Sequence, residues 1–86
     1  MQLQDALYNW LSIKKVAEAR PDDYAAQQTY VFFDEILLED HHIEKIEVKK
    51  DHVMYTIHYW IQGDEQTKQF PIGLIDALLR SIEAEV

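Results

Sequence analysis

The chain has 86 residues, no cysteine and a formal net charge of −8, from 16 acidic residues against 8 lysines and arginines. This length predicts a single domain over residues 1–86, and the absence of cysteine means that no disulfide stabilises it. The excess of acid argues against direct nucleic-acid binding and against anionic membranes, because both need clustered basic residues. The N-terminus lacks signal-peptide features, no apolar run approaches the roughly 20 residues that span a bilayer, and we expect a cytoplasmic protein.

The first twenty residues predict an amphipathic helix. Polar side chains at Gln2, Asp5, Asn9 and Ser12 fall on one side at 100° per residue. The opposite side is apolar and carries Leu3, Ala6, Leu7, Trp10, Leu11, Ile13 and Ala17. The segment from Arg20 to Asp23 contains a proline and two acids, which end this helix and begin the next.

The second predicted helix, about Asp22 to Glu39, has two apolar stripes. The broad stripe consists of Ala25, Thr29, Phe32, Phe33, Ile36 and Leu37. The narrow stripe consists of Tyr24, Val31 and Leu38, spaced by seven. A surface helix needs only one buried stripe. The second one predicts either a central helix packed on both sides, which the small size slightly favours, or a surface for a partner.

Residues Ile43 to Ile72 predict an antiparallel meander of three strands. The odd positions from Val53 to Ile61 are all apolar, so they share one face of a strand. A turn at Lys50-Asp51 sets Val48 opposite Val53 and Ile46 opposite Tyr55. A second turn at Gln62–Glu65 sets Phe70 opposite Ile57 and Ile72 opposite Tyr55. Both predicted pairings place apolar residues on the same face.

The opposite face of this predicted sheet is mostly polar. It carries Lys45, Glu47, Met54, Thr56, His58, Trp60, Thr67 and Gln69. Met54 and Trp60 are its two large apolar members. They are interpreted either as ordinary cross-strand cover, which is favoured, or as part of a binding face, because exposed aromatic residues are enriched at interfaces.

A third helix, about Leu74 to Val86, completes the order α-α-β-β-β-α. Its apolar side carries Leu74, Ile75, Leu78, Leu79, Ile82 and Val86. The expected fold class is α+β, with helices packed on one face of the three-stranded sheet.

Catalytic and metal-binding patterns are lacking in the sequence. The histidines His41, His42, His52 and His58 have no chelating spacing, and the isolated glycines form no phosphate loop. Acids such as Asp34 and Glu35 lie away from the main apolar stripe of their helix, where no pocket raises a carboxyl pKa. We therefore expect no enzyme activity, cofactor or metal site.

Two classes of function remain. The first is a protein-interaction or regulatory module, acting as a homodimer or with another protein through Tyr24, Val31 and Leu38 or through Trp60 and Met54. The second is an acidic inhibitor or nucleic-acid mimic that occludes the basic site of a nuclease or another nucleic-acid-binding protein. Its carboxylates would be those of Asp22, Asp23, Asp34, Glu35, Glu39, Asp40, Glu44 and Glu47.

Overall fold

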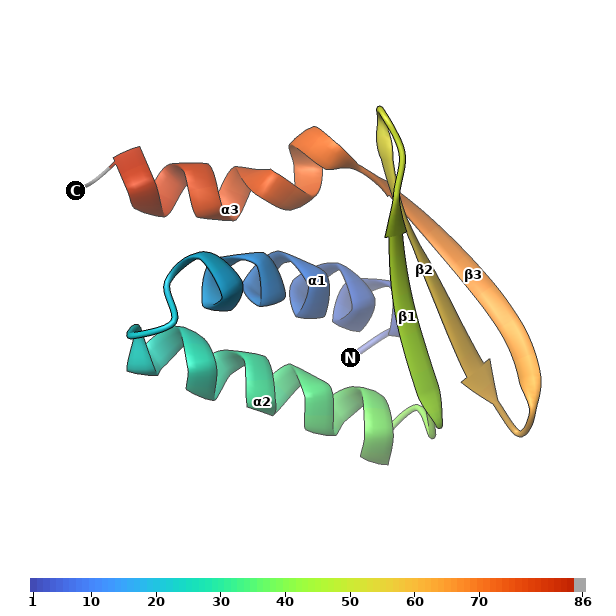
Figure 1. Ribbon diagram of the computed structural model, residues 1–86. Coiled ribbons are helices and arrows are strands. Elements are labelled where there is room, and N and C mark those ends of the chain that lie inside the picture. Colours follow the sequence, from blue (N-terminus) through green and yellow to red (C-terminus); the bar gives the residue numbers. More distant parts are fainter. Residues whose placement is uncertain (85–86) are drawn as a thin grey trace.

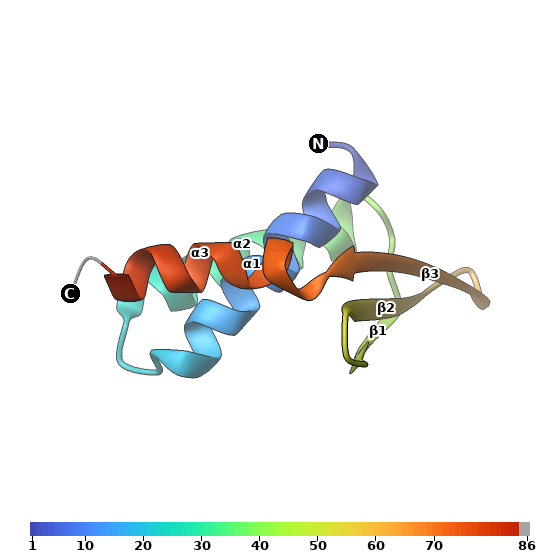
Figure 2. The same cartoon turned by 90° about the horizontal axis from the view of Figure 1, so that it is seen from above.

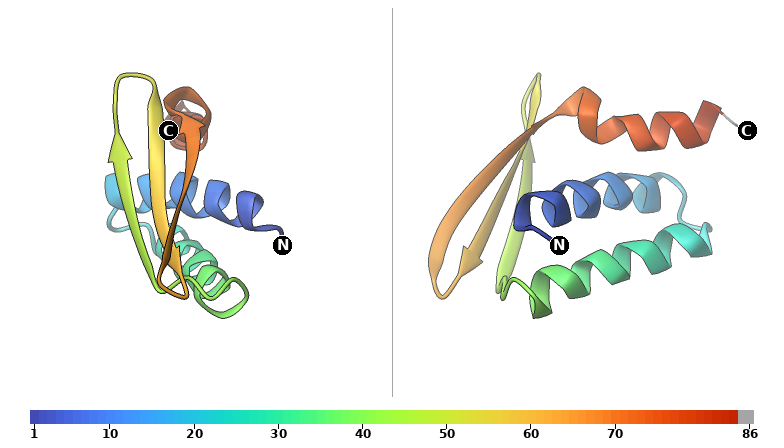
Figure 3. Two further views of the ribbon diagram at one scale, coloured as in Figure 1. Left: turned by 90° about the vertical axis from the view of Figure 1, so that its right-hand side faces the viewer. Right: turned by 180° about the vertical axis from the view of Figure 1, so that it is seen from behind.

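The computed structural model describes residues 1–84 and confirms the predicted order of elements (Figure 1). The helices are α1 (Leu3–Ala19), α2 (Tyr24–Glu39) and α3 (Ile72–Ala84), and the strands are β1 (Lys45–Lys50), β2 (Met54–Ile61) and β3 (Asp64–Pro71). The strands form an antiparallel sheet in the order β1-β2-β3. All three helices lie on one side of the sheet and extend away from it (Figures 2 and 3), so the predicted α+β fold is confirmed.

Helix α1 is the central helix and lies between α2 and α3 (Figure 1). The prediction that favoured α2 for this position is therefore wrong. The reason is that α1 is lined with apolar and small residues around more of its circumference than its main stripe suggests. Val16 is 1% exposed, and even Ser12, predicted on the polar side, is only 3% exposed. The Ser12 hydroxyl has no hydrogen-bond partner among residues 1–84.

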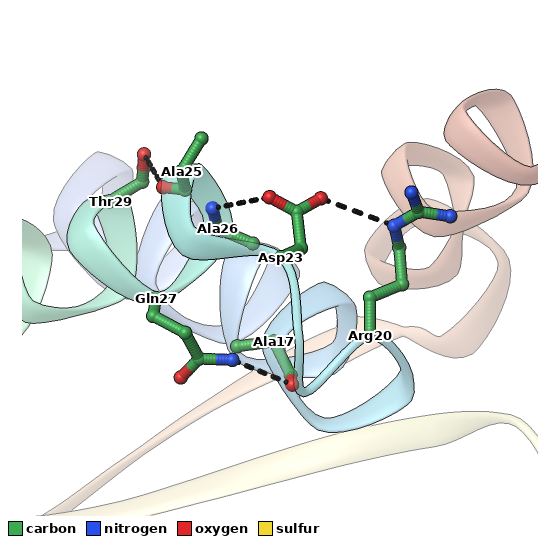
Figure 4. A network of polar contacts seen from close by, with 7 residues as sticks. All are labelled: Ala17, Arg20, Asp23, Ala25, Ala26, Gln27 and Thr29. Atoms are coloured by element: carbon green, nitrogen blue, oxygen red, sulfur yellow. Dashed lines mark hydrogen bonds and ion pairs between the residues drawn. The ribbon is translucent and has the colours of Figure 1, made fainter.

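A polar cluster fixes the turn between α1 and α2 (Figure 4). The carboxylate of Asp23 accepts hydrogen bonds from the backbone amide of Ala26 at 3.0 Å and from Nε of Arg20 at 3.2 Å. Gln27 Nε2 donates to the carbonyl of Ala17 at 3.0 Å. Asp23 is thus the N-cap, and α2 begins at Tyr24. The bond from the Ala26 amide, followed by that from Arg20, lowers the pKa of Asp23.

The turn between β1 and β2 differs from the prediction. It consists of His52 and Val53, and the carboxylate of Asp51 accepts the backbone amides of Val53 at 2.8 Å and Met54 at 2.7 Å. This side-chain cap favours a turn two residues later than the predicted Lys50-Asp51. Val53, predicted on the buried face, is consequently 66% exposed at the tip.

Both predicted registers are wrong, by four residues between β1 and β2 and by two between β2 and β3. Val48 pairs with Ile57 and Ile46 with Tyr59, while Phe70 pairs with Tyr55. Ile72 is not in a strand, because it is the first residue of α3. The second turn is Gln62-Gly63, in which both residues have positive φ, 52° and 81°. That is a type I′ turn, whose twist matches the flanking strands.

An even shift of register leaves each side chain that remains within a strand on its predicted face. The sheet residues Tyr55, Ile57, Tyr59 and Phe70 are therefore buried against the helices, as predicted. The rest of this core comes from the helices and from the segment between α2 and β1: Leu7, Trp10 and Leu11 of α1, Leu37 of α2, Ile75 of α3, and Ile43. Pro71 ends the edge strand β3, as predicted.

Helix α3 buries less of its apolar side than predicted. Ile75 is fully buried and Leu79 and Ile82 are half-buried, but Leu74 and Leu78 are 48% and 40% exposed. The predicted contribution of Val86 lies outside the described residues. No helix within residues 1–84 is long and apolar enough to cross a membrane.

Candidate protein-interaction surface

The side of α2 that faces away from α1 is exposed and carries four large apolar side chains, with the polar residues Gln28 and Glu35 between them. Tyr24, Val31 and Leu38 are 75%, 48% and 59% exposed, and Phe32 beside them is 55% exposed. We call these four residues the α2 outer face. Phe32 was predicted in the buried stripe, but only its neighbour Phe33 turns inward, with ring centroids 5.2 Å apart.

The inner side of α2 is already filled. Ala26 and Leu37 are buried, and Tyr30, Phe33 and Ile36 pack against the core. The outer face is therefore not core, and the narrow stripe predicted from the sequence lies on the surface. Residues seven apart on a helix drift by only about 20°. Tyr24, Val31 and Leu38 thus follow one line over about 21 Å at 1.5 Å per residue.

Charge on α2 is confined to its C-terminal end. The ten residues from Tyr24 to Phe33 carry no charge, whereas Asp34, Glu35 and Glu39 follow them, and the helix has no lysine or arginine. All three carboxylates belong to exposed residues. Asp34 also accepts a hydrogen bond of 3.1 Å from Nε1 of Trp10, which ties α2 to the central helix.

A groove adjoins the C-terminal end of the outer face. It lies between α2 and the residues leading into β1, and its volume is about 250 Å³. Its lining consists of Asp34, Leu37, Leu38, Ile43, Glu44, Lys45 and Ile46. This volume is below the range of about 300–1,000 Å³ typical of small-molecule sites. The groove is closer in scale to a single large side chain.

The other predicted partner residues lie on the open face of the sheet, which no element within residues 1–84 covers (Figures 1 and 3). Met54 and Trp60 are half-buried at opposite ends of β2, about 20 Å apart at 3.3 Å per residue, so they form no common patch. The Lys45 ammonium lies 4.8 Å from the centroid of the Trp60 ring. The structure thus brings three of the five predicted partner-binding residues together on α2 and places Met54 and Trp60 apart from them and from each other.

Cross-strand polar contacts occupy much of this open face. His58 Nδ1 lies 2.8 Å from Glu65 Oε2, and Gln69 Nε2 donates to Thr56 Oγ1 at 3.2 Å. Within β1, the ammonium of Lys45 also lies 3.2 Å from the carboxylate of Glu47. These contacts fit the interpretation of the face as ordinary cross-strand cover.

Imidazole and carboxylate groups do not gather anywhere in residues 1–84 in a set of three or more that could hold a metal ion. His41 Nε2 lies 3.0 Å from the carbonyl of Met1, and His58 contacts Glu65. The expected lack of cofactor, metal and catalysis stays a prediction.

The chain was compared with family models, curated proteins and solved structures. No match was found in any of them. Any role assigned to a residue therefore depends on the geometry and chemistry of this chain.

One polar pair was missed by sequence reasoning. The hydroxyl of Tyr55 in β2 donates a hydrogen bond of 3.1 Å to Oδ1 of Asp76 in α3. The ammonium of Lys15 lies 5.0 Å from the centroid of the Tyr55 ring. Burial, and then the bond and charge of Asp76, raise the pKa of Tyr55 to about 12. A tyrosine that holds its proton this firmly is a poor acid or base at neutral pH. The pair serves to join α3 to the sheet.

This pair predicts a loss of stability at high pH. The folded protein keeps the Tyr55 proton up to a pKa of about 12, whereas an unfolded tyrosine loses it near 10.0. Stability should therefore be undiminished below pH 10 and fall between pH 10 and 12. The phenolate absorbance of wild type minus that of Tyr55→Phe measures the pKa. In Asp76→Asn it should fall towards, but not reach, 10.0, because burial remains. An ordinary pKa in wild type would contradict the buried pair.

Proposed function

We propose that this protein is a small, acidic, cytosolic interaction module without catalytic activity of its own, which binds a protein through the α2 outer face. The observation that supports the proposal is the line of exposed apolar side chains on a helix whose inner side is already filled. Several large apolar side chains exposed on one side of a helix, with polar residues between and around them, are typical of a protein-binding surface. The absence of cysteine agrees with a reducing compartment.

The alternative, an acidic inhibitor or nucleic-acid mimic, has weaker support. A mimic needs carboxylates that are free to meet a basic site. Four of the eight acids in question have partners within the chain: Asp23 with Arg20, Asp34 with Trp10, Glu44 with the amide of Gly63, and Glu47 with Lys45. Charge-dominated binding weakens steeply with salt and apolar association does not, so salt dependence separates the two functions.

Replacing Val31 with glutamate should abolish partner binding and leave the fold intact. A charge in the middle of the outer face must be desolvated on binding, but in the free protein it points to water, because Val31 is 48% exposed. The measurements are light scattering for self-association, affinity capture from the native cell for other proteins, and thermal melting by circular dichroism. Binding of wild type should resist salt.

Val53→Glu is the matched control, since it makes the same change at an exposed valine on the tip of the first hairpin, 66% exposed and far along the chain from α2. It should bind as wild type does. If Val31→Glu keeps the partners and mass of wild type, or if it unfolds the chain, the proposed function is wrong.

A further inference from the structure

We propose that the occupant of the α2 outer face is α2 of a second copy of this chain, running antiparallel about a two-fold axis at Val31. This inference rests on the proposed function, that the face binds a protein. Three separate features of the helix support it: the spacing of its exposed side chains, the distribution of its charges, and the groove beside Leu38.

The spacing is symmetric about Val31. Tyr24 lies seven residues before it and Leu38 seven residues after it. A two-fold axis makes a surface meet itself, so each residue must find a suitable partner on the same patch. With the axis at Val31, this valine packs on its own copy and Tyr24 packs on Leu38 at both ends. Every large side chain on the line thereby gains an apolar neighbour.

The charges select the antiparallel direction. In a parallel pair, Asp34, Glu35 and Glu39 would face the same three carboxylates of the second copy, with no basic residue on either helix to offset the repulsion. In an antiparallel pair about Val31, Asp34 and Glu35 lie opposite Gln28 and Gln27 of the second helix, which carry no charge. Glu39 then lies near Asp23 at the N-terminus of that helix, where Arg20, 3.2 Å from the Asp23 carboxylate, and the helix dipole offset the repulsion, so fewer acidic residues face one another than in the parallel pair.

The groove offers a place for Tyr24. In the antiparallel arrangement the Tyr24 ring of one copy lies opposite Leu38 of the other, and Leu38 lines the groove of about 250 Å³. Leu37, Ile43 and Ile46 supply an apolar lining, and Asp34, Glu44 and Lys45 supply polar groups for the phenol hydroxyl. Tyr24, at 75% exposed, is free to move into such a site, and a tyrosine suits a pocket that is apolar inside and polar at its rim.

The pairing should be weak and reversible. Helix α2 has 16 residues and is about 24 Å long and 10 Å wide with its side chains. That footprint is well below the roughly 800 Å² per partner of a standard interface. The core of one copy is also complete without the other, because the inner side of α2 is covered by α1. We therefore expect a folded monomer at low concentration and a dimer at high concentration.

Single cysteines test the geometry directly, because the natural chain has none. Light scattering first finds the concentration at which wild type is dimeric. Val31→Cys should then form a disulfide-linked dimer on mild oxidation, since helices packed at the axis bring these backbones within the roughly 7 Å that a disulfide needs. Tyr24→Cys should not link to itself, because its copy lies about 21 Å away along the helix. A mixture of Tyr24→Cys and Leu38→Cys should link.

Val53→Cys gives the background from random collision of exposed thiols. If Tyr24→Cys and Leu38→Cys each link to themselves above this background, the antiparallel arrangement is overturned in favour of a parallel one. If wild type stays monomeric at every concentration but captures a different protein in a manner sensitive to Val31→Glu, the self-pairing is wrong and the proposed function stands. If neither self-association nor capture depends on Val31, both fail.

Discussion

Replacing Trp10 with alanine should lower the free energy of unfolding by about 3–5 kcal/mol, the cost typical of truncating a buried aromatic side chain. Trp10 is 2% exposed on the central helix, its ring lies 6.1 Å from that of Tyr30, and its indole donates to Asp34. The substitution thus leaves a cavity where α1, α2 and the sheet meet. A chain of 86 residues has a total stability of about 4–13 kcal/mol, so this loss should be a large share of the total.

The second tryptophan is the matched control. Trp60 lies half-buried on the open face of the sheet, where it contacts Lys45. Trp60→Ala leaves no cavity in the core and should cost far less. Urea titrations followed by circular dichroism compare the two variants, and Trp10→Phe serves if Trp10→Ala does not fold. Equal losses for the two alanine variants, or a Trp10→Phe as stable as wild type, would contradict the central position of Trp10.

Ile57→Ala should cost about 2–5 kcal/mol, as expected for a large-to-small change in a core. Ile57 is fully buried in the middle of β2, the central strand, and faces the helices. Its neighbour Thr56 points to the open face and accepts a hydrogen bond from Gln69. Thr56→Ala should therefore cost much less in the same titration. Similar losses at adjacent positions would show that the faces of the strand have been assigned the wrong way round.

The faces of the strands could be predicted from the sequence, but their register could not. Alternation of apolar and polar residues repeats every two positions, so a shift by two or four residues satisfies it equally well. The choice among these registers lies in the turns. Asp51 caps the first turn through two backbone amides, and Gln62 adopts positive φ in the second. Neither preference is visible in a hydrophobic pattern.

The position of α2 needed the tertiary structure. Two apolar stripes indicate two surfaces, but a stripe does not reveal whether another element covers it. The deciding residues are on α1, where Ser12 and Val16 widen the buried surface and let α1 take the central place. The exposed stripe of Tyr24, Val31 and Leu38 was visible in the sequence, whereas the groove beside it was not. Its walls come from α2 and from the residues that lead into β1.

The central place of α1 also bears on the order in which the chain folds. α1 is synthesised before α2, which covers one of its sides and follows after a turn of a few residues. The other sides of α1 are covered only once the strands and α3, which begins at Ile72, have been synthesised. During synthesis the hairpin of α1 and α2 therefore lacks the core residues of the strands and of α3, which share one buried cluster with Leu7 and Leu11, until α3 has emerged. α3 completes the cover of α1, so a chain shortened before α3 should expose part of its central helix and aggregate more readily.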